Sequence, residues 1–181
     1  YSNKYITYTL DALGRPTAIN NYVSAVTYWP SGQVKQINYA NNTITTYGQN
    51  ARLWPASFRT SKIGGSTYLN TAYGYDGLGN LKSISDATDT SFNRTMSYDN
   101  LNRLTSISGP WGAGSVSYNG SGNITRQAFG SWAINYNYNS SNQLTGISGS
   151  KTENYTYDTY GNVSNAGAIN YGYDEASNLT C

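Results

Sequence analysis

One short sequence unit recurs along this chain and constrains its fold more than any other feature. The unit reads Tyr-x-Tyr-Asp-x-x-Gly-Asn/Arg-Leu-Thr-x-Ile, and its clearest copies are residues 73–84 and 98–107, with further copies at 136–147 and 155–164. A unit of fixed period is built by stacking, because a single copy cannot bury its own apolar face. The chain is therefore expected to be a repeat protein, and a structural or interaction role is favoured over an enzymatic one.

The repeat can be followed through the whole chain by its second aromatic position. We place that position at Leu10, Tyr28, Tyr47, Tyr75, Tyr98, Tyr118, Tyr138, Tyr157 and Tyr173. Several of the intervals are close to twenty residues, whereas the interval from Tyr47 to Tyr75 is 28 residues, which predicts an insertion there. We expect one repeat array over residues 1–181, with degenerate repeats and an insertion in 1–72 and well-formed repeats in 73–181.

The local chemistry of one unit predicts a β-hairpin. The two tyrosines are two residues apart, so on a strand they share one face. The Asp or Asn that follows can bond the backbone two residues on and start a turn, and Gly or Asn three residues later suits a left-handed backbone. Leu81 and Ile84 are three residues apart, so a regular strand would point them to opposite faces. Either both faces are partly covered, or a β-bulge lies near the turn.

Composition agrees with an all-β fold of tandem hairpins in a long curved antiparallel sheet. The chain has 19 Tyr and 19 Gly among 181 residues, and only 11% of its residues are charged. Aromatic and β-branched residues favour strands, and Gly, Asn and Ser separate them. Both ends of such a sheet expose an open edge, so we expect the chain to pair with the remainder of a longer repeat chain or with copies of itself.

The chain offers little for catalysis, and we expect no catalytic residue, no cofactor and no metal. It has no His, and its one Cys is Cys181, so a Ser-His-Asp or Cys-His arrangement, an internal disulfide and a zinc-thiolate cluster are excluded. Paired carboxylates remain, but a shared repeat position indicates turn formation for Asp11, Asp76, Asp99, Asp158 and Asp174. Asp86 and Asp89 fall in a loop that is either simply solvated or a weak calcium contact.

The residues expected to carry the repeat are the aromatic, turn and leucine positions of the well-formed copies. They are Tyr73, Tyr75, Asp76, Gly79, Leu81, Tyr98, Asp99, Arg103, Leu104, Tyr136, Tyr138, Leu144, Tyr155, Tyr157, Asp158, Gly161, Tyr171, Tyr173 and Asp174. Their expected role is structural.

Four tryptophans raise the alternative of a ligand surface. Trp29, Trp54, Trp111 and Trp132 could stack on sugars, or they could cover hairpin edges while the tyrosines form cross-strand ladders. Trp111 is the best candidate for a ligand surface because the Gly-rich loop 109–114 carries it. A net charge of +2 with dispersed basic residues argues against nucleic-acid binding. No apolar stretch long enough to span a membrane is present.

The Tyr-Asp-x-x-Gly-Arg/Asn-Leu-Thr pattern resembles the YD repeats of the RHS family. That family includes bacterial polymorphic toxins, shell components of insecticidal toxin complexes and the teneurins of animals. The resemblance implies a strip of antiparallel hairpins that spirals into a hollow β-shell around a toxin or effector. It also implies a structural wall or scaffold in a secreted or cell-surface protein; the alternative is an extracellular adhesion or glycan-recognition module. No Asp-Pro pair occurs in the chain, so the self-cleavage of many bacterial shells is not carried over.

Overall fold

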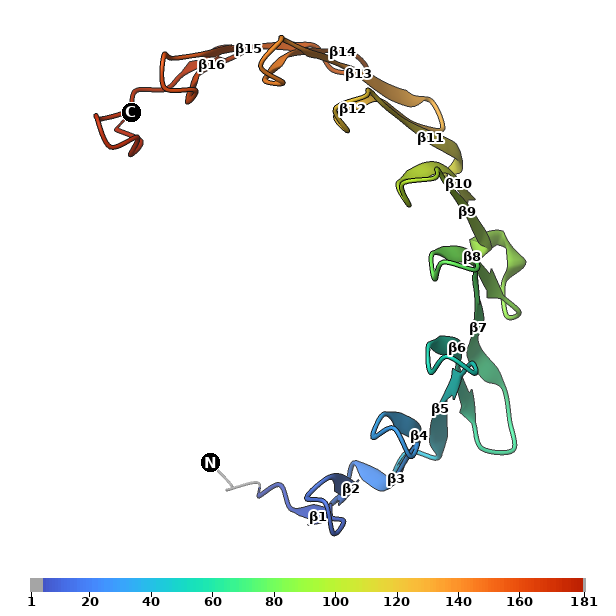
Figure 1. Ribbon diagram of the computed structural model, residues 1–181. Helices are drawn as coiled ribbons and strands as arrows, with labels where there is room; N and C mark the ends of the chain where they lie inside the picture. The colour runs from blue at the N-terminus through green and yellow to red at the C-terminus, as the bar shows by residue number, and fades with distance from the viewer. Residues whose placement is uncertain (1–4, 181) are drawn as a thin grey trace. The chain divides into compact units, whose positions relative to one another are not determined.

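The computed structural model describes residues 5–180, which fold into β-strands and a short 3-10 helix (Figure 1). Cys181 lies outside the described residues. The chain divides into two compact units, Tyr1–Thr95 and Met96–Cys181, which are described separately below. Within residues 5–180, no helix has the length and apolar character needed to cross a membrane.

The first unit is built from hairpins that follow one another along the chain. Its elements are β1 (Tyr8–Leu10), β2 (Pro16–Ile19), β3 (Val23–Tyr28), β4 (Val34–Tyr39), β5 (Thr43–Gln49), β6 (Pro55–Lys62), β7 (Thr67–Tyr75), β8 (Leu81–Asp86) and the 3-10 helix η1 (Thr90–Phe92). Strand β9 (Arg94–Tyr98) begins in this unit, where Arg94 pairs with Ile84 of β8.

The second unit continues the same construction. Its strands are β10 (Leu104–Gly109), β11 (Gly112–Tyr118), β12 (Ile124–Phe129), β13 (Trp132–Tyr138), β14 (Leu144–Gly149), β15 (Glu153–Tyr157), β16 (Val163–Ala166) and β17 (Ile169–Asn170). Each strand pairs antiparallel with its neighbour in sequence, and the pairings together give a 17-stranded sheet. The predicted all-β fold of tandem hairpins is confirmed. The expected division into degenerate and well-formed repeats stays a prediction.

A β-bulge beside the turn decides which side chains of a hairpin share a face. In the β7–β8 hairpin, Tyr73 opposes Ile84 and Tyr75 opposes Leu81, and the register shifts between Gly74 and Tyr75. The extra residue on β8 brings Leu81 and Ile84 to the face that carries both tyrosines, so the bulge is the correct alternative of the two. We call this side of the sheet the tyrosine face.

The same register shift recurs in hairpins of both units. Between the shift and the turn, the last aromatic residue of one strand opposes the first apolar residue of the next. The pairs are Tyr28 with Val34, Tyr118 with Ile124, Tyr138 with Leu144, and Tyr157 with Val163. The repeat therefore stacks a ring on an aliphatic side chain at every such step, which is the cross-strand pairing that stabilises sheets.

The third repeat corrects one predicted position. Tyr47 opposes Phe58 and therefore occupies the first aromatic position, not the second; the second position belongs to Gln49, which opposes Pro55. The turn that follows begins at Asn50, whose Oδ1 accepts hydrogen bonds from the following backbone. The prediction of Tyr47 was wrong because this copy lacks both the second tyrosine and the turn glycine that mark the register elsewhere.

The predicted insertion lengthens one hairpin rather than forming a separate loop. Strands β6 and β7 contain 8 and 9 residues, against 6 in β3 and β4. They meet at a tight turn in which the backbone N–H of Gly65 donates to the carbonyl of Lys62. The extra residues between Gln49 and Tyr75 thus lengthen these two strands at the end opposite the Tyr-Asp turns, which stay undisturbed.

The core is thin because the strands form a single layer. The apolar side chains exposed below a tenth of their area are Met96, Val116 and Ile134, and the polar ones are Thr45, Ser61 and Asp86. Among the described residues, no large side chain is completely buried. Stability must therefore come from contacts repeated between adjacent strands and turns, which are the contacts that make up the candidate site.

Candidate functional site: the Tyr-Asp turns and the tyrosine face

The Tyr-Asp turn is a five-residue loop closed by backbone and carboxylate hydrogen bonds. In the 99–103 turn, the N–H of Asp99 donates to the carbonyl of Arg103 at 2.9 Å, and the N–H of Asn102 donates to the carbonyl of Asp99 at 3.0 Å. Asp99 Oδ1 accepts from the backbone N–H of Leu101 and of Arg103. The fourth residue is left-handed, with φ 60° at Asn102, as a short polar side chain permits.

The fifth residue of the turn binds the second carboxylate oxygen. Arg103 donates from Nε at 2.8 Å and from Nη2 at 2.7 Å to Asp99 Oδ2, and Arg15 does the same to Asp11. The other aspartate turns use an asparagine amide in that place. These bonds are Asn80 to Asp76, Asn162 to Asp158, and Asn178 to Asp174.

These contacts lower the pKa of the turn carboxylates. The backbone N–H of Arg103 and then its guanidinium hold the pKa of Asp99 below its ordinary value of 3.8. At Asp76, the Asn80 amide and the backbone N–H groups of the turn lower the pKa in the same way. A carboxyl that serves as a general acid needs its pKa raised instead. Each of these carboxylates accepts its hydrogen bonds from residues of its own turn.

The second tyrosine of a repeat reaches back to the repeat before it. Its hydroxyl donates to the backbone carbonyl of the residue that starts the preceding repeat's second strand. In the second unit the bonds run from Tyr118 to Leu104, Tyr138 to Ile124, and Tyr157 to Leu144, at 2.8–2.9 Å. In the first unit they run from Tyr28 to Pro16 and from Tyr75 to Pro55. The phenol thus bonds repeat to repeat, between two strands that are direct neighbours in the sheet.

The fifth turn residue also covers the next tyrosine ring. The guanidinium of Arg15 lies 4.3 Å from the ring centre of Tyr28, and that of Arg103 lies 4.3 Å from Tyr118. In the third turn, Trp54 replaces the arginine and packs against Tyr75 with ring centres 5.1 Å apart. A cation or ring over the π-face of tyrosine is a favourable arrangement. Arg15 and Arg103 therefore contact both the carboxylate of their own turn and the following tyrosine ring.

The first tyrosines of the repeats bond within the sheet. Thr71 Oγ1 donates to the Tyr73 hydroxyl at 3.4 Å, Tyr136 donates to Gln127 at 2.8 Å, and Tyr155 donates to Glu153 at 3.1 Å. Burial is the main cause that raises the pKa of Tyr47, Tyr138 and Tyr155 above its ordinary value. The tyrosine face is thus partly shielded from water.

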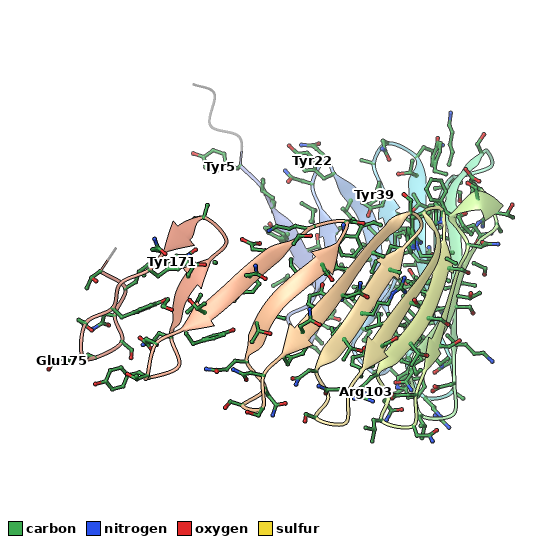
Figure 2. All side chains as sticks on the ribbon, turned by 90° about the horizontal axis from the view of Figure 1, so that it is seen from above. Tyr5, Tyr22, Tyr39, Arg103, Tyr171 and Glu175 are labelled. Carbon is green, nitrogen blue, oxygen red and sulfur yellow. The ribbon has the colours of Figure 1, made fainter. Side chains whose placement is uncertain are left out.

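Successive hairpins of a meander turn at opposite ends of the strands, so the Tyr-Asp turns lie at one end and the connecting turns at the other. In Figure 2, Arg103 and Glu175 of the second unit lie at the strand ends that carry the Tyr-Asp turns, and Tyr171 lies toward the opposite ends. The last repeat is held by a bridge between Tyr173 and Leu179 and by the Asp174 turn. In the first unit, Tyr22 and Tyr39 lie at the strand ends that carry the connecting turns (Figure 2).

The tryptophans divide into covered and exposed ones. Trp29 donates from Nε1 to the carbonyl of Tyr47 at 3.1 Å, and Trp54 packs on Tyr75, so both serve the repeat. Trp111 and Trp132, in the second unit, keep 43% and 42% of their area exposed. The Trp111 indole lies over Gly109, where a Cβ would come within 2.9 Å of the ring.

The loop that holds Asp86 and Asp89 satisfies its own carboxylates. Asp86 Oδ1 accepts from the backbone N–H of Thr88 at 2.8 Å and of Asp89 at 3.2 Å. Asp89 caps helix η1 by accepting from the N–H of Ser91. Within residues 5–180, no three His, Cys, Asp or Glu side chains group as a metal site would need.

A hollow in the tyrosine face of the first unit was missed by the sequence analysis. Its volume is about 510 Å³, and it is lined by Gln33, Val34, Tyr47, Gly48, Gln49, Pro55, Ser57, Phe58, Tyr73, Tyr75 and Leu81. The signal was present in the third repeat, where Gln49 and Pro55 replace the tyrosine and the leucine of the unit. Once the register is known, that loss of a large side chain predicts a gap.

Comparison with known proteins agrees with this geometry. Residues 75–113 match the family model described as RHS Repeat. No curated protein matches the chain.

Solved structures match over nearly the whole chain. The match to TcdB2-TccC3-Cdc42 has a TM-score of 0.66 at 17% identity and covers 96% of this chain and 12% of the matched chain. The Photorhabdus luminescens Tc holotoxin pore with the TccC3-D651A mutation gives 0.61 at 17% identity, covering 94% of this chain and 12% of its own. TcdB2-TccC3 gives 0.59 at 16% identity, covering 96% of this chain and 13% of its own. The chain thus spans about an eighth of the length of the chains it matches, and at these identities the likeness concerns the fold. The resemblance drawn from the Tyr-Asp pattern is confirmed, because residues 75–113 match the RHS Repeat model and the chain is similar in fold to these Tc toxin structures.

Proposed function

We propose that this chain is a non-catalytic wall or scaffold segment of a secreted or cell-surface RHS-like shell that encloses or presents a toxin or effector. The observation that carries the proposal is the use made of the repeated polar groups. Turn carboxylates bond their own loops, and tyrosine hydroxyls such as Tyr138 bond the preceding repeat. The carboxylates thus close the turns and the hydroxyls join the repeats, and both uses suit a continuous barrier.

The partners that fit this proposal are further repeats and an enclosed polypeptide. The chain covers 12–13% of the length of Tc toxin chains that share its fold, so a shell of similar kind needs many more hairpins. Those hairpins belong either to a longer chain that contains this one or to copies of it joined through open strand edges. The cargo is a toxin or effector by analogy with the toxin structures.

The test is the structure and protease resistance of the complete natural polypeptide that contains this chain. Cryo-electron microscopy should show the repeats as a closed wall with protein density inside it. Digestion under native conditions should spare the enclosed region until the wall is unfolded, and mild denaturant supplies the matched unprotected state. Repeats that stand open to solvent on both faces, with no enclosed protein and no protection, would refute the wall function.

A second candidate function is glycan recognition, and the exposure of Trp111 and Trp132 favours it. Flat, solvent-facing indole rings are suitable stacking surfaces for sugars. Screening the protein against an array of glycans, with Trp111→Ala and Trp132→Ala beside it, tests this function. Trp29→Ala is the contrasting variant, because Trp29 is engaged inside the repeat. Binding that is lost with the exposed tryptophans supports recognition, and an array without a hit rejects it.

A further inference from the structure

The hollow in the first unit lies where one repeat lacks the tyrosine that its neighbours have. Gln49 holds the second aromatic position of the third repeat and opposes Pro55. In the next repeat the same position is Tyr75, which opposes Leu81, and in the previous one it is Tyr28, which opposes Val34. The gap of about 510 Å³ is well above the volume that one aromatic side chain needs and falls within the range of ligand pockets.

The neighbouring repeats show how a phenol is held at this position. Its hydroxyl donates to the carbonyl that starts the preceding repeat's second strand, as Tyr28 does to Pro16 at 2.6 Å and Tyr75 does to Pro55 at 2.9 Å. Its ring is covered by the fifth residue of the preceding turn, as Arg15 covers Tyr28. A ring in the third repeat would thus have two defined partners.

Both of those partners line the hollow. Val34 starts the second strand of the preceding repeat, so its carbonyl is equivalent to that of Pro16 or Pro55, and Gln33 is the fifth residue of the preceding turn. Gln33 hydrogen-bonds Gln49, whose amide also reaches Ser31 at 3.4 Å. These contacts lie in exposed positions, so the two amides can part at small cost and let a ring enter.

The remaining wall is aromatic and apolar. Tyr47 and Phe58 pack with ring centres 5.2 Å apart, and burial raises the pKa of Tyr47. Tyr73 and Tyr75 close the side toward the next repeat. A ring between these groups gains aromatic contacts on its faces and edges.

We propose that this hollow is a binding subsite for the tyrosine side chain of a bound polypeptide, with the ring in the missing repeat position and the hydroxyl donating to the carbonyl of Val34. The occupant is a tyrosine because the repeat itself places a tyrosine there in adjacent copies. The subsite is thus an incomplete repeat that a second polypeptide completes, and it stands apart from the role of the chain as a wall.

The direct test is an NMR titration of the isotope-labelled protein with a Gly-Gly-Tyr-Gly-Gly peptide amide. A single anchored ring should give a dissociation constant on the order of 1 mM, with shifts centred on residues that line the hollow. The matching Phe peptide should bind roughly 2- to 10-fold more weakly, because it lacks the hydroxyl bond. Equal binding of the two peptides, or no shifts at the hollow, would overturn the proposal.

A matched pair of variants locates the binding. Gln49→Tyr should fill the hollow, weaken peptide binding by at least about 10-fold and raise Tm by roughly 2–4 °C through the added ring contacts. Gln36→Tyr adds the same side chain on the opposite face of β4, because Gln36 opposes Thr27, and should leave binding unchanged. Undiminished binding in Gln49→Tyr, or a fall in its Tm, would show that the hollow does not have the shape of a tyrosine site.

A third titration, with p-cresol, separates a polypeptide ligand from a free phenol. The Tyr peptide should bind at least as tightly as p-cresol, because the hollow is open to the flanking backbone of a chain that crosses the strands. A p-cresol affinity above that of the peptide would mean that the flanking chain is rejected, and a polypeptide occupant would be ruled out.

Discussion

The substitution Tyr138→Phe isolates the bond that joins one repeat to the preceding one. It removes a hydroxyl that donates to the Ile124 carbonyl at 2.8 Å and leaves the half-buried ring against Leu144. A net intramolecular hydrogen bond of this kind contributes about 0.5–1.5 kcal/mol. Because Ile124 is only half-buried, water can reach its carbonyl in the variant. We therefore expect the free energy of unfolding to fall by about 1 kcal/mol.

Urea unfolding monitored by tyrosine fluorescence measures this loss, and a separate thermal melt gives the change in Tm. For a chain of this size, 1 kcal/mol corresponds to a fall in Tm of about 2–4 °C. Tyr160→Phe is the control, because Tyr160 is 77% exposed in its turn and its hydroxyl loss should change the free energy by no more than about 0.5 kcal/mol. If Tyr138→Phe and Tyr160→Phe cost the same, the hydroxyl ladder does not hold the repeats together.

Two further perturbations probe the turns. The backbone N–H and the guanidinium of Arg103 hold the pKa of Asp99 below 3.8. The ionised carboxylate therefore stabilises the fold above pH 3.8, and this contribution is lost as the pH falls through the lowered pKa of the folded state. Tm measured from neutral pH to about pH 2 should drop in this window, and less steeply in Asp99→Asn. Gly79→Ala should lower the free energy of unfolding, measured in urea, by about 1–3 kcal/mol, because φ at Gly79 is +97° and the new Cβ would lie 2.8 Å from the Trp54 ring. Gly77→Ala is the control and should be near neutral, because nothing lies within 4 Å of the Cβ that it adds.

Much of this fold is readable from the repeat because local chemistry determines it. The carboxylate of Asp99 and the left-handed Asn102 specify a turn through contacts no more than four residues apart. Such short-range bonds are written in the sequence at fixed offsets, so the hairpins and their order could be predicted. The side of the sheet that receives Leu81 could not, because the bulge opposite Tyr75 depends on how two strands align.

The hollow shows where sequence reasoning fails and why. Tyr47 is an aromatic residue near the expected interval, so a pattern search places the repeat on it. The true register follows from the turn at Asn50 and puts Gln49 into the tyrosine position. A gap is the absence of a side chain, and its size and walls depend on residues of several strands. Only the folded sheet brings Val34 and Tyr73 to the same space.

The first and fifth residues of several turns vary together in a way that explains why the repeat tolerates changes. Where the first residue is Asp, the fifth is Arg or Asn and donates to the carboxylate. Where the first residue is Asn139, the fifth is Gln143, and the bond reverses, since the Asn139 amide now donates to Gln143 Oε1 at 2.8 Å. In both cases Oδ1 of the first residue accepts the same two backbone N–H groups. In these turns an acceptor at Oδ1 recurs and a negative charge is not essential. The turn that begins at Trp29 has no such side-chain acceptor and is closed by backbone bonds, from the N–H of Trp29 to the carbonyl of Gln33 and from the N–H of Gly32 to the carbonyl of Trp29. The backbone pattern is therefore the constant part of the turn, which is why repeats that lack the carboxylate keep the hairpin.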